Sequence, residues 1–215
     1  KYPNRFFMEG ISEQHIVGMA SGLALSGFTV YINTIATFLT RRCFEQNVIN
    51  AGLHNLNIRF IASGGGCVYA PLGPTHIAND DIAIMNTIPN MAIISVADKV
   101  EMKKMMEQTL KYNGPIYIRL GKGNDPIITS ENKKFKIDKA CSFFRGKKIT
   151  LISTGITTKI CIDVAKKLNN ENYSAQVLHF PTIKPFDEKF LISKIKFTKK
   201  IIVVEEHSII GGLHS

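Results

Sequence analysis

The sequence contains no tryptophan, few cysteines and no apolar run close to the roughly 20 residues that cross a bilayer. Its four cysteines, Cys43, Cys67, Cys141 and Cys161, are widely spaced and never form a CxxC pair. This spacing argues against zinc and disulfides and favours buried thiols. The first residues do not resemble a secretion signal. We therefore expect a cytoplasmic protein without a membrane segment.

Acidic residues are also scarce, with 17 Asp and Glu against 27 Lys and Arg, and the formal net charge is +10. A basic chain is a candidate for nucleic-acid binding. Here, however, the lysines are dispersed as pairs such as Lys103-Lys104 and Lys199-Lys200, and no basic helix or aromatic RNA-binding motif accompanies them. Such pairs are typical of solvated helix and strand edges. We expect no nucleic-acid partner.

Short β-rich apolar runs alternate with amphipathic segments along the chain, which predicts an α/β protein with mainly parallel sheets. Helices are expected from Ser12, as the cap, to about Leu25, from Lys99 to Tyr112 with Asp98 as the cap, over 157–168 and near 188–195. The expected strands are 28–32, 58–62, 91–96, 116–120, 149–153, 175–179 and 201–204.

The periodic pattern breaks between residues 121 and 147 into a polar, lysine-rich stretch that contains Pro126. We interpret it as a linker with room for an edge strand, between a first domain over 1–120 and a second over 148–215. The first domain is expected to begin with a strand at Phe6-Phe7-Met8. Both domains are expected to be incomplete, because the first begins almost immediately with that strand and Gly211-Gly212 in the second would ordinarily lead into another helix.

A carboxylate stands at the start of the first helix, in Gly10-Ile11-Ser12-Glu13-Gln14. Glu13 follows a predicted strand, at the edge of a parallel sheet where such folds bind ligands. The local pattern alone is more often that of a favourable helix start. Gly64-Gly65-Gly66 permits close backbone approach but lacks a full GxGxxG or GK[ST] motif, so a phosphate loop is a poor interpretation.

Two further side chains are placed to meet a ligand. His76 stands on the rigid turn Gly73-Pro74-Thr75-His76, where it either faces a ligand or caps the turn. Arg119 ends a predicted strand, where a guanidinium either grips a phosphate or carboxylate or pairs with Asp98 or Glu101. Glu205-Glu206-His207 has neither metal spacing nor a nucleophile and is assigned a structural or interface role.

Taken in order, several motifs resemble the pyrimidine-binding domain of transketolases. They are Arg5–Gln14, Thr37-Phe38-Leu39-Thr40-Arg41-Arg42, Gly73-Pro74-Thr75-His76, Asp81-Ile82-Ala83 and Pro115–Arg119. Two later motifs, Thr182–Asp187 and Val204–His207 with Gly211-Gly212, are similar to the C-terminal domain of the same family. The resemblance covers nearly the whole chain. It implies a pyrimidine-type thiamine diphosphate-binding fold followed by a transketolase C-terminal-like domain.

The resemblance also implies roles for individual residues. Glu13 matches the catalytic glutamate that hydrogen bonds to N1′ of the aminopyrimidine of thiamine diphosphate and so makes the cofactor its own base. Phe38 matches the aromatic residue that packs on the pyrimidine, and Ile35 fills a second position that is often aromatic. His76 matches a catalytic histidine near the cofactor and the reacting carbonyl. Arg119 matches the arginine that holds the substrate phosphate.

Two departures from the family bear on the substrate. Gly64 and Leu72 stand where sugar-cleaving transketolases carry a histidine and an aspartate that contact donor hydroxyls. A leucine leaves such a hydroxyl without a partner, at a cost of roughly 1–3 kcal/mol. We expect a donor other than a standard ketose phosphate, such as a deoxy sugar, a ketoacid or a nucleotide-linked sugar.

The chain lacks the diphosphate-binding domain of the family, with its Gly-Asp-Gly motif and ligands for Mg²⁺. The resemblance therefore implies a diphosphate-binding domain or subunit as partner, in a homodimer or heterotetramer with the cofactor and Mg²⁺ between domains. A transketolase-like transfer of a two-carbon ketol unit from a phosphorylated sugar or ketoacid to an aldehyde is the expected activity. The alternatives are a 1-deoxyxylulose-5-phosphate synthase-like decarboxylating carboligase and a non-catalytic partner subunit.

Overall fold

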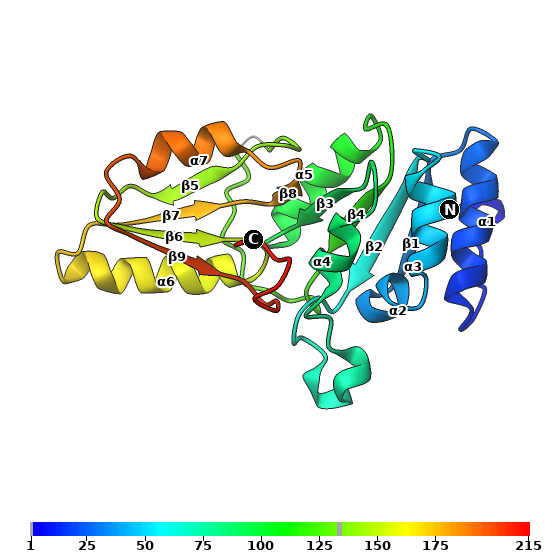
Figure 1. Ribbon diagram of the computed structural model, residues 1–215, viewed down its shortest axis with the longest axis horizontal. Coiled ribbons are helices and arrows are strands. Elements are labelled where there is room, and N and C mark those ends of the chain that lie inside the picture. Colours follow the sequence, from blue (N-terminus) through cyan, green and yellow to red (C-terminus); the bar gives the residue numbers. More distant parts are fainter. Residues whose placement is uncertain (1, 133–134) are drawn as a thin grey trace.

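The computed structural model describes residues 2–132 and 135–215 and contains two α/β units arranged end to end along its longest axis (Figure 1). The first sheet has the strand order β1-β2-β4-β3-β8, and the second has the order β5-β7-β6-β9. Among the described residues, only the edge strands β8 and β5 run antiparallel to their neighbours. The predicted class, two α/β domains with mainly parallel sheets, is confirmed.

The observed elements follow the predicted alternation closely. The strands are β1 (Val30–Ile35), β2 (Ile58–Ser63), β3 (Ala92–Ser95), β4 (Ile116–Arg119), β5 (Cys141–Phe144), β6 (Ile149–Ser153), β7 (Ala175–His179), β8 (Thr182–Lys184) and β9 (Lys200–Val204). The longer helices are α1 (Glu13–Leu25), α5 (Lys99–Thr109), α6 (Thr157–Asn170) and α7 (Glu188–Ile195), and the shorter ones are α2 (Ala36–Thr40), α3 (Phe44–Gln46), α4 (Asp81–Asn86) and a π-helical turn at Asn47–Gly52. Three 3₁₀ turns cover Pro3–Arg5, Ala70–Leu72 and Pro74–His76.

The first sheet separates two apolar layers, because alternate residues of its buried strands point to opposite faces. On one face Phe60, Ile93 and Tyr117 join a core with α1, α2 and α4. On the other face Ile94 and Ile118, with their neighbours on β3 and β4, pack against α5. Along each strand of this sheet, side chains therefore point alternately to the side of α4 and to the side of α5.

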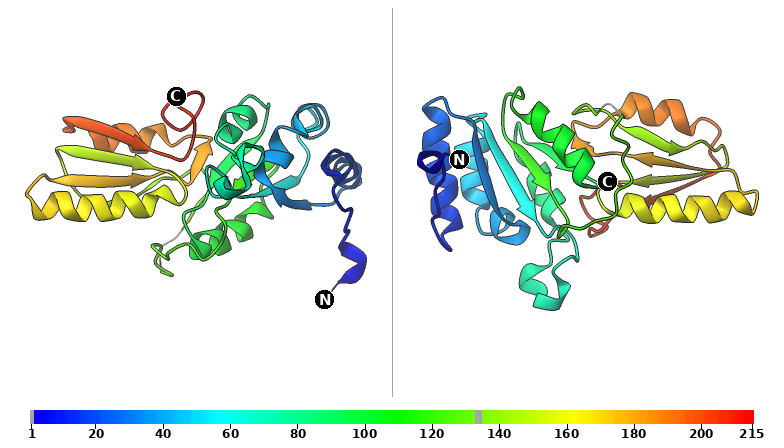
Figure 2. Two further views of the ribbon diagram at one scale, coloured as in Figure 1. Left: turned by 90° about the horizontal axis from the view of Figure 1, so that it is seen from below. Right: turned by 180° about the vertical axis from the view of Figure 1, so that it is seen from behind.

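Two local predictions at the start of the chain are wrong. Phe6, Phe7 and Met8 form no strand; no described strand lies beside them, their side chains are exposed, and the segment extends away from the body (Figure 2). Ser12 stands at the N-cap position, but its hydroxyl donates to the Glu9 carbonyl at 2.6 Å instead of capping the helix. Helix α1 therefore begins without a side-chain cap.

The strand predicted from Phe28 begins two residues later because α1 ends through its own backbone. The amide of Phe28 donates to the Leu23 carbonyl at 3.2 Å, and Gly27 adopts φ +91°. This pattern is a common helix C-terminus in which glycine supplies the left-handed residue. Phe28 therefore belongs to the end of the helix.

The two units share a sheet, because β8 leaves the second unit and pairs antiparallel with β3 of the first. The amide of Ser95 donates to the Pro181 carbonyl at 2.7 Å, next to this pairing. A buried polar chain lies close by: His179 Nε2 is 3.0 Å from a Glu101 carboxylate oxygen, and its Nδ1 is 2.7 Å from the Thr158 hydroxyl. All three side chains are buried, so the interface between the units is a fixed one.

The predicted cap of α5 is confirmed, and Asp98 does more than cap. One carboxylate oxygen accepts from the amides of Val100 and Glu101, and the other accepts from those of Ile128 and Thr129 at 2.8 and 2.7 Å. Burial opposes ionisation, but these amide donors outweigh it and lower the pKa of Asp98. Asp98 thus ties the segment after β4 to the start of α5.

Replacing Asp98 with Ala is expected to lower the free energy of unfolding at pH 7 by about 2–3 kcal/mol, since a helix cap and two further buried amide bonds are lost. Because the folded pKa lies below the unfolded value of about 3.9, this contribution is complete above that pH and is lost as pH falls through the folded pKa. Urea unfolding from pH 7 to pH 3 measures both effects. Asp98→Asn is the control for charge, and a deficit that stays constant as pH falls would contradict this assignment.

Candidate functional site

Glu13 lies in the first turn of α1 with its carboxylate buried, 6% of the side chain being exposed. One oxygen accepts from Arg42 Nη1 at 2.6 Å. The neighbouring Gln14 side chain donates to the Arg42 carbonyl at 3.0 Å, so the first turn of α1 holds both ends of Arg42. The site therefore contains a carboxylate that is shielded from water and faces a single cation.

Phe38 stands on α2, which follows β1 without an intervening loop. The Arg42 guanidinium carbon lies 4.3 Å above the centre of its ring, in cation–π geometry. The His76 ring approaches from the side, with centroids 5.1 Å apart and an interplanar angle of 71°. Glu13, Arg42, Phe38 and His76 thus form one continuous cluster, which we call the Glu13 cluster.

His76 ends the 3₁₀ turn Pro74–His76, in the segment that projects from the carboxyl ends of the strands (Figure 1). Its Nδ1 lies 2.9 Å from the Thr75 hydroxyl, which fixes the ring orientation. The described contacts leave Nε2 available to a ligand. Ile35, half-buried, is the last residue of β1 and directly precedes the helix that carries Phe38.

Arg42 belongs to the Glu13 cluster, although sequence reasoning assigned it no role. It is part of the quoted Thr37–Arg42 motif, but two adjacent arginines give no indication of which one faces the site. The fold separates them. Arg41 turns away and holds the Asp80 carboxylate through Nε and Nη2 and the Ile77 carbonyl at 2.8 Å.

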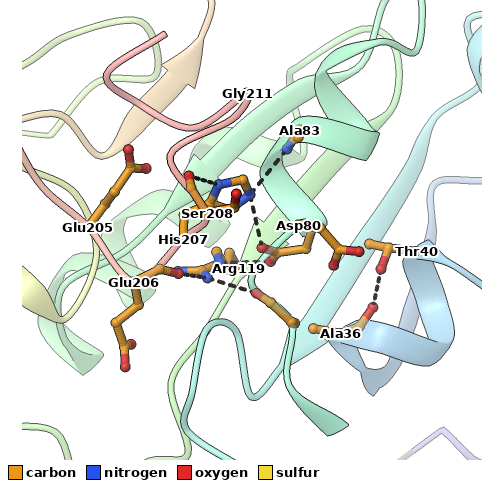
Figure 3. Close-up of polar contacts among 12 residues, drawn as sticks. Ala36, Thr40, Asp80, Ala83, Arg119, Glu205, Glu206, His207, Ser208 and Gly211 are labelled. Carbon is orange, nitrogen blue, oxygen red and sulfur yellow. Dashed lines mark hydrogen bonds and ion pairs between the residues drawn. The ribbon is translucent and has the colours of Figure 1, made fainter. Parts of the chain in front are cut away.

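Arg119 lies outside the Glu13 cluster, in a buried network with α4 and the end of the second unit (Figure 3). Its Nε donates to Asp81 at 2.7 Å, and its Nη2 donates to the carbonyls of Ala78 at 3.2 Å and Glu206 at 2.7 Å. Tyr117 donates to the same Asp81 oxygen at 2.7 Å. Three protein acceptors therefore surround this guanidinium.

The predicted alternative partners of Arg119, Asp98 and Glu101, are wrong for a geometric reason. Arg119 and Tyr117 are two residues apart on β4 and point to the α4 side of the sheet, where Asp81 lies. Asp98 and Glu101 belong to α5 on the opposite face. Burial alone would lower the pKa of Arg119, but Asp81 raises it. Burial, followed by the Asp81 charge, raises the pKa of Tyr117 well above its usual value.

His207 completes the Arg119 network from the second unit. Its Nε2 accepts from the Ala83 amide at 3.4 Å and lies 3.9 Å from Asp81 Oδ1, and its Nδ1 lies 2.9 Å from the Ser208 carbonyl (Figure 3). Glu205 accepts from the backbone amides of Leu213 and His214. These contacts place Glu205-Glu206-His207 at the junction between the units.

The two departures at Gly64 and Leu72 have different surroundings. A Cβ at Gly64, which adopts φ +74°, would lie 2.1 Å from the Tyr69 ring, so a side chain at this position requires Tyr69 to move. Leu72 ends the turn Ala70–Leu72, and its side chain is exposed.

A separate cavity of about 550 Å³ lies on the α5 side of the first sheet. It is lined by ends of strands, by the start of α5 and by the segment after β4, including Asn33, Ser63, Lys99, Lys122 and Asp125. None of the sequence-predicted site residues lines it. The Glu13 cluster and this cavity are therefore on different faces of the sheet.

The described residues contain no group of three or more His, Cys, Asp or Glu side chains arranged to hold a metal ion. They also contain no helix that is long and apolar enough to cross a membrane.

Residues 1–126 match the family model described as the transketolase pyrimidine-binding domain, and residues 142–215 match that of the transketolase C-terminal domain. Among curated relatives, a putative transketolase C-terminal section of Methanocaldococcus jannaschii is 33% identical over 99% of this chain and 67% of its own length. One of the subunits of the apulose-4-phosphate transketolase of Actinobacillus succinogenes is 34% identical over 100% of this chain and 69% of its own length. The chain thus spans about two thirds of these relatives.

A longer relative and two solved structures complete the comparison. The 1-deoxy-D-xylulose-5-phosphate synthase of Desulfitobacterium hafniense is 31% identical over 100% of this chain and 34% of its own length. A split-gene transketolase, described as an inactive beta4 tetramer, superimposes with a TM-score of 0.91 at 32% identity, over 99% of this chain and 69% of that one. A transketolase from Pichia stipitis superimposes with a TM-score of 0.82 at 20% identity, over 94% of this chain and 31% of that one. At this identity the match supports the fold alone.

Removing the Asp81 carboxylate is expected to destabilise the fold strongly. Asp81→Ala leaves the Arg119 guanidinium buried without a counter-ion, which costs about 3–5 kcal/mol, whereas Tyr117→Phe loses one hydrogen bond and costs about 1–2 kcal/mol. Urea unfolding followed by circular dichroism compares the two variants with the unmodified chain. An Asp81→Ala variant within about 1 kcal/mol of the unmodified chain would show that the ion pair does not stabilise the junction.

Proposed function

The chain belongs to the transketolase family, and we propose that it supplies the pyrimidine-side half of a transketolase-like active site dependent on thiamine diphosphate. The single observation that carries this proposal is the buried Glu13 carboxylate beside an aromatic face at the carboxyl end of a parallel sheet. Ligands of open α/β sheets bind at this edge. The matching family domains use the same cofactor.

The residues of the Glu13 cluster fit an aminopyrimidine. Such a ring needs a flat apolar surface for its face and a shielded carboxyl group for a ring nitrogen. Phe38 provides the first, supported by Ile35, and Glu13 provides the second. When bound, thiamine diphosphate supplies the nucleophilic carbon that takes up and passes on a two-carbon unit.

Glu13 acts by holding a proton between its carboxyl group and the ring nitrogen. Burial is essential to this role, because in water the proton would be lost to solvent. His76 stands beside Phe38 with Nδ1 held by Thr75, so Nε2 is the atom that meets a substrate oxygen. There it stabilises developing negative charge or exchanges a proton with that oxygen.

Arg119 acts first as a positioning residue in this proposal. Its Nη2 holds the carbonyl of Ala78, two residues after His76, and that of Glu206 in the second unit. The segment that carries His76 is thereby fixed to both units. The role in gripping a substrate phosphate stays a prediction, because only 6% of the Arg119 side chain is exposed here.

The donor is proposed to lack the hydroxyl pattern of a standard ketose phosphate. Tyr69 fills the space beside Gly64, and Leu72 offers no hydrogen bond, so neither position serves a sugar hydroxyl. A deoxy sugar, a ketoacid or a nucleotide-linked sugar meets no unpaired polar group at these positions. Relatives named for apulose 4-phosphate and 6-deoxy-6-sulfofructose indicate that such variety exists in the family.

A partner domain or subunit is proposed to hold the diphosphate and Mg²⁺. Relatives that match this chain over nearly its whole length are named as transketolase subunits, and one solved relative is a split-gene transketolase. We propose a cytoplasmic complex, homodimeric or heterotetrameric, whose active site combines both halves.

A decarboxylating carboligase is the second candidate, favoured by the 1-deoxy-D-xylulose-5-phosphate synthase relative that matches this chain over its whole length. Incubating the assembled complex with an aldehyde acceptor and either pyruvate or a ketose as donor separates the two. Release of carbon dioxide from pyruvate supports the carboligase, and ketol transfer from the ketose without release of carbon dioxide supports the transketolase-like reaction. A non-catalytic subunit would give neither activity with a competent partner.

Exchanging Glu13 for Gln is expected to lower turnover of the assembled complex at least about 100-fold, because the amide cannot hold the proton on the ring nitrogen. Far-ultraviolet circular dichroism should show an unchanged fold, since Gln keeps the shape of the side chain. The matched control is Glu9→Gln, whose carboxylate lies 3.6 Å from His15 outside the Glu13 cluster. Near-normal turnover of the Glu13 variant would rule out its catalytic role.

A further inference from the structure

Two adjacent arginines at the end of α2 have entirely different surroundings. Arg41 is held by the Asp80 carboxylate and the Ile77 carbonyl. Arg42 makes its side-chain contacts with Glu13 and the Phe38 ring. Both side chains are partly exposed, Arg41 by 37% and Arg42 by 42%. The two arginines therefore differ in their partners and not in their exposure.

The Arg42 guanidinium makes the two contacts that the proposed function assigns to the aminopyrimidine. It is planar, lies 4.3 Å above the Phe38 ring, and directs an N–H group at Glu13 from 2.6 Å. A flat ring that stacks on this face of Phe38 and bonds to the same Glu13 oxygen would need the space that the guanidinium fills. The guanidinium and a ring bound in this way exclude each other.

We infer that Arg42 is a built-in competitor for the pyrimidine subsite, which occupies it until the cofactor enters and then moves outward. This inference rests on the proposed function and adds a residue that tunes the affinity of the chain for its cofactor. A buried carboxylate without a partner is unfavourable, so a cation beside Glu13 stabilises the chain while the subsite holds no pyrimidine.

The surroundings of Arg42 allow such an exchange. Its side chain is partly exposed and bonds to one carboxylate oxygen, so it reaches solvent without breaking a network. Moving Arg42 outward breaks one ion pair, whose Arg42 end is already partly in solvent, and one cation–π contact of modest energy. Arg41 cannot take its place, because Asp80 and Ile77 hold its guanidinium elsewhere.

Competition has a measurable consequence. If the subsite is open for only a fraction of the time, the dissociation constant for the cofactor rises by the inverse of that fraction. Removing Arg42 should therefore tighten cofactor binding while it destabilises the free chain. Removing a residue with a merely structural role would weaken cofactor binding and also lower the stability of the free chain.

The test measures Kd for thiamine diphosphate, with Mg²⁺ present, by isothermal titration of this chain assembled with its partner subunit. Arg42→Ala is expected to bind about three- to tenfold more tightly than the unmodified complex. The same variant should lower the urea midpoint of the full-length chain. Arg41→Ala, the matched control, should not bind more tightly.

Arg42→Gln provides a second variant that keeps most of the side-chain length without the charge, and it should also bind more tightly. Unchanged or weaker binding by both Arg42 variants, with the unmodified complex binding normally, overturns the competitor and leaves the proposed function intact. Failure of the unmodified complex to bind thiamine diphosphate overturns both. Equal tightening by Arg41→Ala also overturns the inference, because it indicates a general charge effect.

Discussion

The buried pair of Asp81 and Arg119 is the interaction on which the arrangement of the whole chain depends. It joins α4 to β4, and through Arg119 it reaches the backbone of Ala78 and Glu206. The segment that carries His76 and the last part of the second unit are therefore tied to one guanidinium. Arg has the donors for this task, whereas Lys lacks the planar fork. Space around it is also limited, since a Cβ on Gly65 would lie 2.6 Å from the Arg119 side chain.

Three buried carboxylates show how the surroundings of a charge decide its role. Asp81 pairs with the buried Arg119, and Glu101 with the buried His179, so neither pair can open without exposing a charge to a dry interface. Glu13 is equally buried, but its partner Arg42 is partly exposed. Among these three pairs, only that of Glu13 has a partner that reaches solvent. The Asp81–Arg119 pair holds α4 on β4, the Glu101–His179 pair joins the two units, and the third pair is suited to a ligand.

The sequence predicted most of the fold because burial imposes a period that can be recognised in the residues. Strands such as Ile116–Arg119 and helix α7 lie within two residues of their predicted bounds. The failures occur where a partner decides the outcome. Phe6–Met8 has the composition of a strand but no neighbouring strand among the described residues, and β8 gains its strand geometry from β3 in the other unit. A local sequence pattern does not show whether a segment has a neighbouring strand to pair with.

The candidate site divides in the same way. Glu13, Phe38 and His76 were predicted from the resemblance of ordered motifs to a family, and the fold brings them together through contacts that the motifs do not state. The sequence did not predict which carboxylate pairs with Arg119, because that depends on the face of the sheet to which Arg119 points. It also did not predict which of Arg41 and Arg42 faces Glu13, because that depends on where the short helix α2 ends.

Gly64, which replaces a histidine of the family, has to be considered together with its neighbours before a substrate is inferred from it. Tyr69 occupies the volume that a side chain at position 64 would need, and Gly64 itself has the left-handed backbone that disfavours other residues. A histidine introduced there would thus meet both a steric and a conformational barrier. Gly64 and Tyr69 are therefore coupled: a side chain at position 64 requires the tyrosine ring to move. A Gly64→His exchange alone thus does not restore the family's histidine, since Tyr69 has to change with it.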